Sequence, residues 1–226
     1  MDTISTLAVT GADALEFLQG QLSNDLKRLD DQSEIKAAWC NPKGRVIWFG
    51  AVSATQAGYE LAVPTDMVAG IVSRLTMFRF RSKVDFNVSA DSREVNAADL
   101  IQAGIPYIGS QQSEQFTPHM LNLDLLDAIS FDKGCYTGQE IVARTHYKGA
   151  TKRRTLRFTS DAPVSVGDKL SHGDRQVGEV LNAAGNALLA VMNVEVANKP
   201  LTINGVPIKR DEMPYAVSAG DIGDSD

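Results

Sequence analysis

The stretch from Phe131 to Arg144 restricts the structure around it more than any other part of this sequence. At its centre, Lys133 to Glu140 reads K-G-C-Y-T-G-Q-E, which places a thiol, a phenol, an amide, a cation and a carboxylate around two glycines. Glycines permit a positive φ or a close backbone approach, and this mixture of side chains fits neither a regular helix nor a strand. The stretch predicts a tight loop with binding or reactive groups, followed by a regular element from Gln139. A surface turn whose polar groups only face water is the alternative.

The composition predicts a globular protein in the cytoplasm. A chain of 226 residues with 43% hydrophobic residues can bury one large core or two modest ones. Its apolar runs are too short to span a bilayer, and its first residues lack the basic and apolar blocks of a secretory signal. The two cysteines, Cys40 and Cys135, are far apart and are not flanked by histidine pairs. We therefore expect free thiols, and neither a disulfide framework nor a metal site.

The first half of the chain predicts an α+β unit. Ala12 to Gln19 has a broad apolar face that Gly20 can end, and Ser23 is placed to cap a helical turn ending near Leu29. Two β-prone segments then flank Asn41-Pro42-Lys43-Gly44, which predicts a hairpin. A strand is predicted at Tyr59 to Val63, and a helix capped by Thr65 then extends to Leu75. A half-buried strand is predicted at Val84 to Val88. This order favours helices on one face of an antiparallel sheet.

The second half predicts a loop-rich connection and then a small β domain. Asp99 to Ala103 could form one helical turn, and the apolar segment from Met120 to Ile129 is expected to anchor the central loop. Short β-prone pieces follow Thr155, and Asn204-Gly205 is a strong hairpin signal. These pieces predict a small barrel or sandwich. The expected division is residues 1–150, residues 151–215 and a disordered acidic tail at residues 216–226.

The charge distribution is uneven along the chain. The net charge of −6 argues against a dominant nonspecific attraction to nucleic acid. Between Lys133 and Arg157, however, Glu140 is the one acid among seven cations, so this segment is strongly basic. Its cations could contact an RNA such as tRNA, or they could form an ordinary solvated face at a domain junction. The candidates for a weak tRNA contact are Lys148, Lys152, Arg153 and Arg154.

Cys135 is the candidate reactive group of the central loop. A thiol beside Lys133 and near Arg144 could favour the thiolate form, which suits a redox, cluster-handling or nucleophilic role. The alternative is a small buried hydrophobe beneath the loop. Around it, Arg144 could bind a carboxylate, Gln139 could contact the edge of a heteroaromatic ring, and Tyr136 could stack on it. Hydrogen bonds that merely stabilise the loop would explain the same residues.

The absence of other motifs narrows the chemistry. The sequence contains no Gly-x-Ser-x-Gly elbow, no Walker loop and no Gly-x-Gly-x-x-Gly fingerprint. Its three histidines do not form a pair with metal-ligand spacing. The remaining hypothesis is a polar loop that holds a flat heteroaromatic or carboxylate-bearing ligand.

The central stretch closely resembles the K-G-C-Y-x-G-Q-E motif of the YgfZ family of folate-binding proteins. That family is related to the glycine-cleavage T-protein and to a mitochondrial iron-sulfur assembly factor. Further matches to the family run in order along the chain: Leu18 to Asp25, Cys40 to Arg45, Arg81 to Val84, Phe116 to Leu123 and Lys148 to Arg153.

The resemblance implies an α+β, T-protein-like fold, with ferredoxin-like folate-binding modules followed by a small C-terminal β-barrel. It also implies tetrahydrofolate, or a folate derivative, as ligand, and a role in assembling or repairing iron-sulfur enzymes, including those that modify tRNA. Cys135 is then the candidate catalytic thiol. The implied folate-binding residues are Asp25, Gln102, Lys133, Tyr136, Gln139, Glu140 and Arg144.

Three departures from the related sequences affect these expectations. The interval from Asp85 to Gln115 leaves no room for a complete second ferredoxin-like module, so the domain is expected to be shortened there. Gln102 stands where relatives usually have a glutamate, and it would keep a hydrogen bond but lose the charge. Val46-Ile47-Trp48-Phe49 replaces the acidic residues that serve the folate amine in aminomethyltransferases. Classical aminomethyl transfer is therefore not expected.

Three functions remain open from the sequence. The first is a tetrahydrofolate-binding accessory protein for iron-sulfur enzymes. The second is a folate-dependent one-carbon transferase, which the missing acids weaken. The third is a noncatalytic RNA-binding module, which lacks an aromatic platform beyond Tyr147 in the basic segment.

Overall fold

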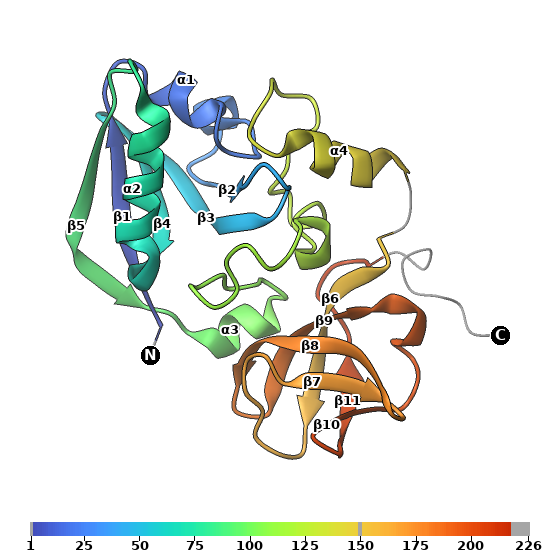
Figure 1. The fold of residues 1–226 in the computed structure, drawn as a ribbon. Helices are drawn as coiled ribbons and strands as arrows, with labels where there is room; N and C mark the ends of the chain where they lie inside the picture. The colour runs from blue at the N-terminus through green and yellow to red at the C-terminus, as the bar shows by residue number, and fades with distance from the viewer. Residues whose placement is uncertain (1, 149–150, 218–226) are drawn as a thin grey trace. The chain divides into compact units, whose positions relative to one another are not determined.

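The computed structural model describes residues 2–148 and 151–217 of the chain (Figure 1). These residues form two compact units. The first comprises residues 2–95, 108–117 and 127–143, and the second comprises residues 96–107, 118–126, 144–148 and 151–217. The acidic tail expected at residues 216–226 lies almost wholly outside the described residues.

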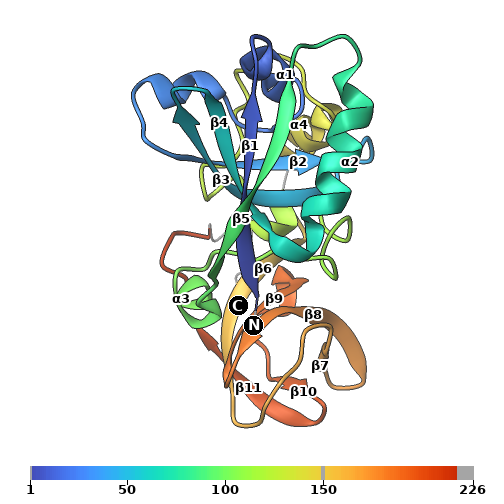
Figure 2. The same cartoon turned by 90° about the vertical axis from the view of Figure 1, so that its left-hand side faces the viewer.

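The first unit is built on one antiparallel sheet of five strands. Its spatial order is β2-β3-β4-β1-β5, and Figure 2 shows β1 running between β4 and β5. The strands are β1 (Thr3–Thr10), β2 (Ile35–Cys40), β3 (Val46–Thr55), β4 (Gly58–Pro64) and β5 (Asp85–Glu94). The apolar start of the chain is therefore a strand paired on both edges, which the sequence analysis did not assign.

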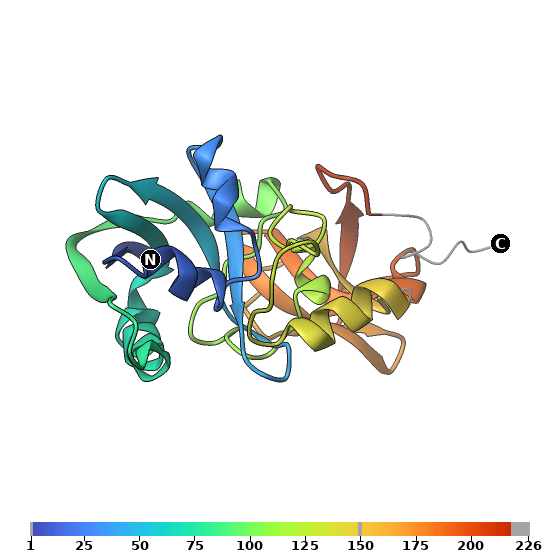
Figure 3. The ribbon, with the colours of Figure 1, turned by 90° about the horizontal axis from the view of Figure 1, so that it is seen from above.

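Helices cover the sheet and complete the apolar core of the first unit. The helix α2 (Val68–Arg79) lies along one face of the sheet (Figure 3) and buries Val68, Ile71 and Leu75. The short helix α1 (Ala14–Gln19) buries Phe17 and Leu18. Both helices were predicted from apolar residues at helical spacing.

Two predicted helix caps are wrong, because tertiary contacts use those hydroxyls. The 3₁₀ helix η1 (Leu26–Asp30) is capped by Asp25, while the Ser23 hydroxyl donates to the carbonyl of Ala128 at 2.7 Å. The Thr65 side chain makes no capping bond to the 3₁₀ turn η2 (Thr65–Met67), and its hydroxyl is hydrogen-bonded to that of Ser5. A hydroxyl that could cap a helix locally also suits a long-range hydrogen bond.

The second unit contains a closed six-stranded barrel, which confirms the β-rich C-terminal domain. Its strand order is β10-β11-β6-β9-β8-β7. The strands are β6 (Arg153–Ser160), β7 (Lys169–His172), β8 (Arg175–Ala184), β9 (Ala187–Asn193), β10 (Leu201–Ile203) and β11 (Val206–Asp211). Asn204 and Gly205 both have positive φ, as the predicted two-residue hairpin requires. The 3₁₀ turn η4 (Val194–Val196) follows β9.

The second unit also includes segments that precede the barrel in the sequence, so it differs from the predicted boundary at residue 151. These segments contain the helix α3 (Ala97–Gln102) and the 3₁₀ turn η3 (His119–Leu121). Hydrogen bonds explain their placement: the Asn122 side chain donates to the carbonyl of Thr155, and Asn182 exchanges two hydrogen bonds with the backbone of Tyr107. A domain boundary drawn at one sequence position cannot predict that earlier segments pack with a later domain.

The middle of the chain is short, as expected. Between β5 and the helix α4 (Gln139–Lys148), the described residues form two short helices, α3 and η3, and no second sheet. The fold is thus an abbreviated α+β unit followed by a β-barrel.

Candidate functional site

The central loop and the β2–β3 turn approach each other more closely than side chains would allow. Gly138 has a φ of +83°, and a Cβ atom there would lie 2.5 Å from the carbonyl oxygen of Asn41. Across the same contact, Gly44 has a φ of +68°, and a Cβ atom there would lie 2.8 Å from the Cβ of Ile141. The motif therefore needs glycine at position 138 for both conformation and space. Gly134, the other motif glycine, has open space around it in the described part of the chain.

Lys133 fastens the loop to the segment that follows α1. Its side chain is buried, and its Nζ donates to the carbonyls of Gln19, Leu22 and Asn24 at 2.7, 2.6 and 3.0 Å. An ammonium has three donors, so these bonds satisfy it completely. Burial lowers the pKa of Lys133 to about 8, while the charge of Asp25 acts in the opposite direction. The contacts assign Lys133 a positioning role.

Asp25 and Tyr136 lie near this ammonium. The Nζ of Lys133 is 5.3 Å from the centre of the buried Tyr136 ring. Burial raises the pKa of the Tyr136 phenol well above its ordinary value, and Cys40 adds to the effect. For Asp25, burial would raise the pKa, but hydrogen bonds from Gln19 and the Lys27 N–H, with the charges of Lys133 and Lys27, lower it overall. The structure thus brings these three predicted residues together beneath the loop.

A pocket of about 250 Å³ opens beside the loop, within the first unit. Its wall includes Thr137 of the motif and Glu114 of the segment before it. Trp39 also lines the pocket, and its buried Nε1 has no hydrogen-bond partner among the described residues. The remaining lining residues come from the β2–β3 hairpin and from α2: Cys40, Asn41, Pro42, Ile47, Arg74, Met77 and Phe78. The pocket therefore combines apolar walls with a few fixed polar groups, as ligand sites commonly do.

Glu114 supplies the carboxylate of this pocket. One oxygen accepts a hydrogen bond from the Asn41 side chain at 2.9 Å, and the other pairs with Arg74. The hydrogen bond from Asn41, followed by that from Arg74, lowers the pKa of Glu114 against the effect of burial. Its backbone N–H donates to Val46 at 2.7 Å, with a φ of +63° that is uncommon outside glycine.

The sequence analysis missed Glu114 as a candidate site residue, because this residue lies in the connection that was expected to be rich in loops. The one available signal was an acid just before the Phe116 to Leu123 match.

The other predicted residues lie elsewhere. Cys135 is exposed and does not line the pocket, whereas Cys40 is fully buried and burial raises its pKa to about 12. Both cysteines are free thiols. Gln139 is half-buried and Glu140 is exposed, at the start of α4. Arg144 and Gln102 are exposed residues counted with the second unit, where the Gln102 carbonyl accepts from Arg157.

The basic segment does not form one charged surface. Arg154 is 5% exposed, and its Nη1 lies 2.7 and 2.9 Å from the two carboxylate oxygens of Asp124. Arg153 pairs with Glu179, whereas Lys152 is exposed. Adjacent residues of β6 point to opposite faces of the strand, which explains why one of two neighbouring arginines is buried. The predicted tRNA contact is therefore wrong for Arg154; Lys148 has no described side chain.

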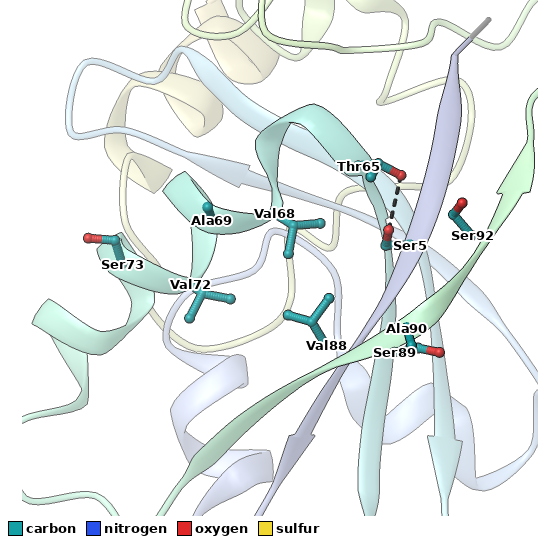
Figure 4. Close-up of a pocket in the computed structure, with 10 residues that line it drawn as sticks. All are labelled: Ser5, Thr65, Val68, Ala69, Val72, Ser73, Val88, Ser89, Ala90 and Ser92. Carbon is teal, nitrogen blue, oxygen red and sulfur yellow. Dashed lines mark hydrogen bonds between the residues drawn. The ribbon is translucent and has the colours of Figure 1, made fainter.

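The described lining of a second hollow in the first unit lacks groups suited to catalysis. A hollow of about 660 Å³ between α2 and β5 is lined by small side chains, and Figure 4 shows Val68, Val72 and Val88 facing one another across it. It contains no titratable group among its described lining residues. Across residues 2–148 and 151–217, no three His, Cys, Asp or Glu side chains gather in a way that could hold a metal ion. None of the described helices is long and apolar enough to cross a membrane.

Comparison of the structure defines the fold. The glycine cleavage system aminomethyltransferase T of Bartonella henselae is similar, with a TM-score of 0.71 and 12% identity, over 93% of this chain and 83% of that structure. Residues 152–215 match the family described as the C-terminal beta-barrel domain of CAF17. The chain therefore has a T-protein-like fold with a CAF17-type barrel.

Comparison of the sequence then gives three relatives. An uncharacterized protein of Haemophilus influenzae is 28% identical over 268 residues, which cover 94% of this chain and 95% of that protein. The tRNA-modifying protein YgfZ of Escherichia coli is 27% identical, over 84% of this chain and 80% of its own length. YgfZ of Sodalis glossinidius is 40% identical over 57% of this chain, although the match spans only 40% of that protein. This chain is therefore similar to proteins of the YgfZ family, in agreement with the resemblance of its central motif.

One alignment is longer than this chain. The alignment to the Haemophilus relative has 268 positions, more than the 226 residues of this chain, so the relative has segments that this chain lacks.

Proposed function

We propose that this chain binds tetrahydrofolate or a related folate and acts as an accessory protein in tRNA modification. The observation that carries the proposal is the pocket beside the motif loop, where the Glu114 carboxylate stands among the apolar side chains of Ile47, Met77 and Phe78. A pterin ring is flat, and its edge presents N–H donors that suit a carboxylate. The T-protein-like fold and the relatives named as tRNA-modifying proteins support the same proposal.

The size of the pocket matches part of a folate. Pockets for drug-sized ligands have volumes of roughly 300–1,000 Å³. At about 250 Å³, this pocket suits one bicyclic ring, with the rest of the ligand outside it. Met77 and Phe78 would contact the ring faces, while Asn41 and Arg74 hold Glu114 in place. Folate would supply a one-carbon carrier, and the residues of this chain bind and orient it.

The predicted residues take different parts in this proposal. Lys133 holds the loop against residues 19–24, with Asp25 and Tyr136 close to its ammonium. Cys135 is exposed, so its thiol is accessible to a protein partner such as an iron-sulfur enzyme. Gln139 and Glu140 remain proposed contacts for the parts of a folate beyond the ring, and folate binding by Arg144 and Gln102 remains a prediction from the sequence.

The proposal is tested by titrating tetrahydrofolate into the purified chain in a calorimeter. Glu114→Gln keeps the shape of the side chain but loses the charge, and charged hydrogen bonds contribute about 1.5–3 kcal/mol. We therefore expect affinity to fall roughly tenfold to a hundredfold. Glu212→Gln, an exposed position in the second unit, is the matched control and should bind like the wild type. Absence of binding by the wild-type chain, or equal affinity of the Glu114→Gln variant, would reject this site.

One-carbon transfer is the second candidate, and the lining of the pocket weakens it. Ile47 lies in the pocket within the segment where aminomethyltransferases carry acids, and Glu114 is the one acidic residue among the described lining. Incubation of the chain with a folate one-carbon adduct should leave that adduct unchanged. Catalytic turnover would favour the transferase.

A further inference from the structure

The turn that joins α2 to β5 contains an aromatic residue in a conformation that suits glycine. The N–H of Ser82 donates to the carbonyl of Arg79 at 2.8 Å, which closes a four-residue turn. Within it, Phe80 has φ +45° and ψ −109°, close to the first central position of a type II′ turn. Glycine normally occupies that position, because a Cβ atom is strained there. The Phe80 backbone is therefore strained.

Phe80 is also the most exposed large apolar side chain in the described residues. It is 87% exposed, so its ring gains little from burial. It borders an open hollow of about 680 Å³, together with Asp13, Arg81 and Ser82. Neither folding nor the turn itself explains a phenyl ring at this position.

Three cations, Arg79, Arg81 and Lys83, lie within three residues of Phe80 in the sequence. Arg81 and Lys83 are exposed, and neither has an ion pair in the described part of the chain. Arg79 lies 3.9 Å from Asp85, in a pair whose side chains are 41% and 80% exposed. Asp13, the acid beside the hollow, accepts the backbone N–H of Lys83 at 2.7 Å and so holds the turn. The turn therefore presents an aromatic face with a positive charge on its C-terminal side.

We infer that Phe80, Arg81 and Lys83 form a contact site for an unpaired segment of RNA. An exposed ring can stack on a base of any sequence, and neighbouring cations neutralise the backbone phosphates. We choose tRNA as the RNA because of the proposed role in tRNA modification, so the inference rests on that proposed function. It places the contact outside the basic segment from Lys133 to Arg157, where Lys133 and Arg154 are buried.

The test measures binding of an unmodified tRNA transcript and of a short oligouridine by fluorescence anisotropy at several salt concentrations. Phe80→Gly removes the ring and relieves the backbone strain, so the variant should fold with an unchanged or higher melting temperature. Its affinity for both RNAs should fall roughly 5- to 100-fold. Arg81→Ala and Lys83→Ala should each reduce the slope of log affinity against log salt by about 1.

Two controls make the outcome decisive. Tyr147→Ala removes an exposed ring within the basic segment, and Arg175→Ala removes an exposed cation of the barrel. Both variants should bind RNA like the wild type. Wild-type affinity in Phe80→Gly, or a loss confined to Tyr147→Ala, would overturn the inference. So would the absence of RNA binding by the wild type, which would point to a protein partner for Phe80. The Phe80→Gly variant should bind tetrahydrofolate with the affinity of the wild type. A failure of the proposed folate site can therefore be distinguished from a failure of the proposed RNA contact.

Discussion

At the scale of single residues, the motif divides into groups that hold the loop and groups that remain accessible. Lys133 donates all three of its hydrogen bonds to backbone carbonyls, and Gly138 permits the contact with Asn41. Cys135 is exposed on the same loop. Residues within one motif can therefore have unrelated physical roles, and only some of them can contact a ligand.

Lys133 provides a pH-dependent test of its positioning role. Its pKa in the folded chain, about 8, lies below the ordinary lysine value of about 10.4. Between these values the unfolded chain binds more protons, so the contribution of this group to the free energy of unfolding rises with pH. We expect the wild type to gain stability relative to Lys133→Met from pH 8 to pH 10, measured by urea denaturation.

At neutral pH, Lys133→Met should also lose about 1–3 kcal/mol, because three buried carbonyls lose their donor. Lys199→Met, at an exposed position, controls for the loss of a lysine charge. Parallel stability curves for the wild type and Lys133→Met across pH 8–10 would contradict the assignment.

At the scale of elements, the site depends on how two turns meet. The β2–β3 turn and the loop before α4 contact each other through Gly44 and Gly138, and residues 113–116 lie along the start of β3 through hydrogen bonds with Val46 and Ile47. This arrangement places Glu114 beside Asn41. The pocket is therefore a property of the packed turns and not of the motif alone.

Gly138→Ala tests this packing. The added methyl would lie 2.5 Å from a carbonyl oxygen, at a φ of +83°. We expect a loss of stability of more than about 1 kcal/mol and weaker folate binding, because the pocket wall at Thr137 must shift. Gly134→Ala, in open space, should change stability by less than about 0.5 kcal/mol. Thermal denaturation of the two variants side by side gives the comparison, and equal melting temperatures would argue against the close contact.

At the scale of the whole molecule, chain segments from before the barrel complete the second unit. The ion pair between Arg154 of β6 and Asp124 ties one such segment to the barrel, with both side chains at most 10% exposed. Breaking a buried pair leaves an uncompensated charge and typically costs about 3–5 kcal/mol. The stability of this unit should depend strongly on the pair.

Asp124→Ala tests that dependence. We expect hydrogen exchange to accelerate in β6 and β9, while β1 and β4 of the first unit keep their protection. Replacing both partners, as Asp124→Leu with Arg154→Met, should recover part of the loss, because no charge is then left buried. Equal acceleration in both units would show that the pair stabilises the chain as a whole.

The sequence by itself determined the order of most elements, the hairpin turns and the family motif. These depend on local rules: apolar residues at helical or alternating spacing, and glycine or asparagine where φ is positive, as at Asn204-Gly205. Only the tertiary structure decided which polar side chains form hydrogen bonds or ion pairs inside the protein. The sequence predicted Ser23 and Thr65 as helix caps, Lys133 as a folate contact and Arg154 as a possible tRNA contact. In the structure, each of them bonds to residues distant in the chain. Glu114 became a site residue for the same reason, because its partners Asn41 and Arg74 are brought to it only by folding.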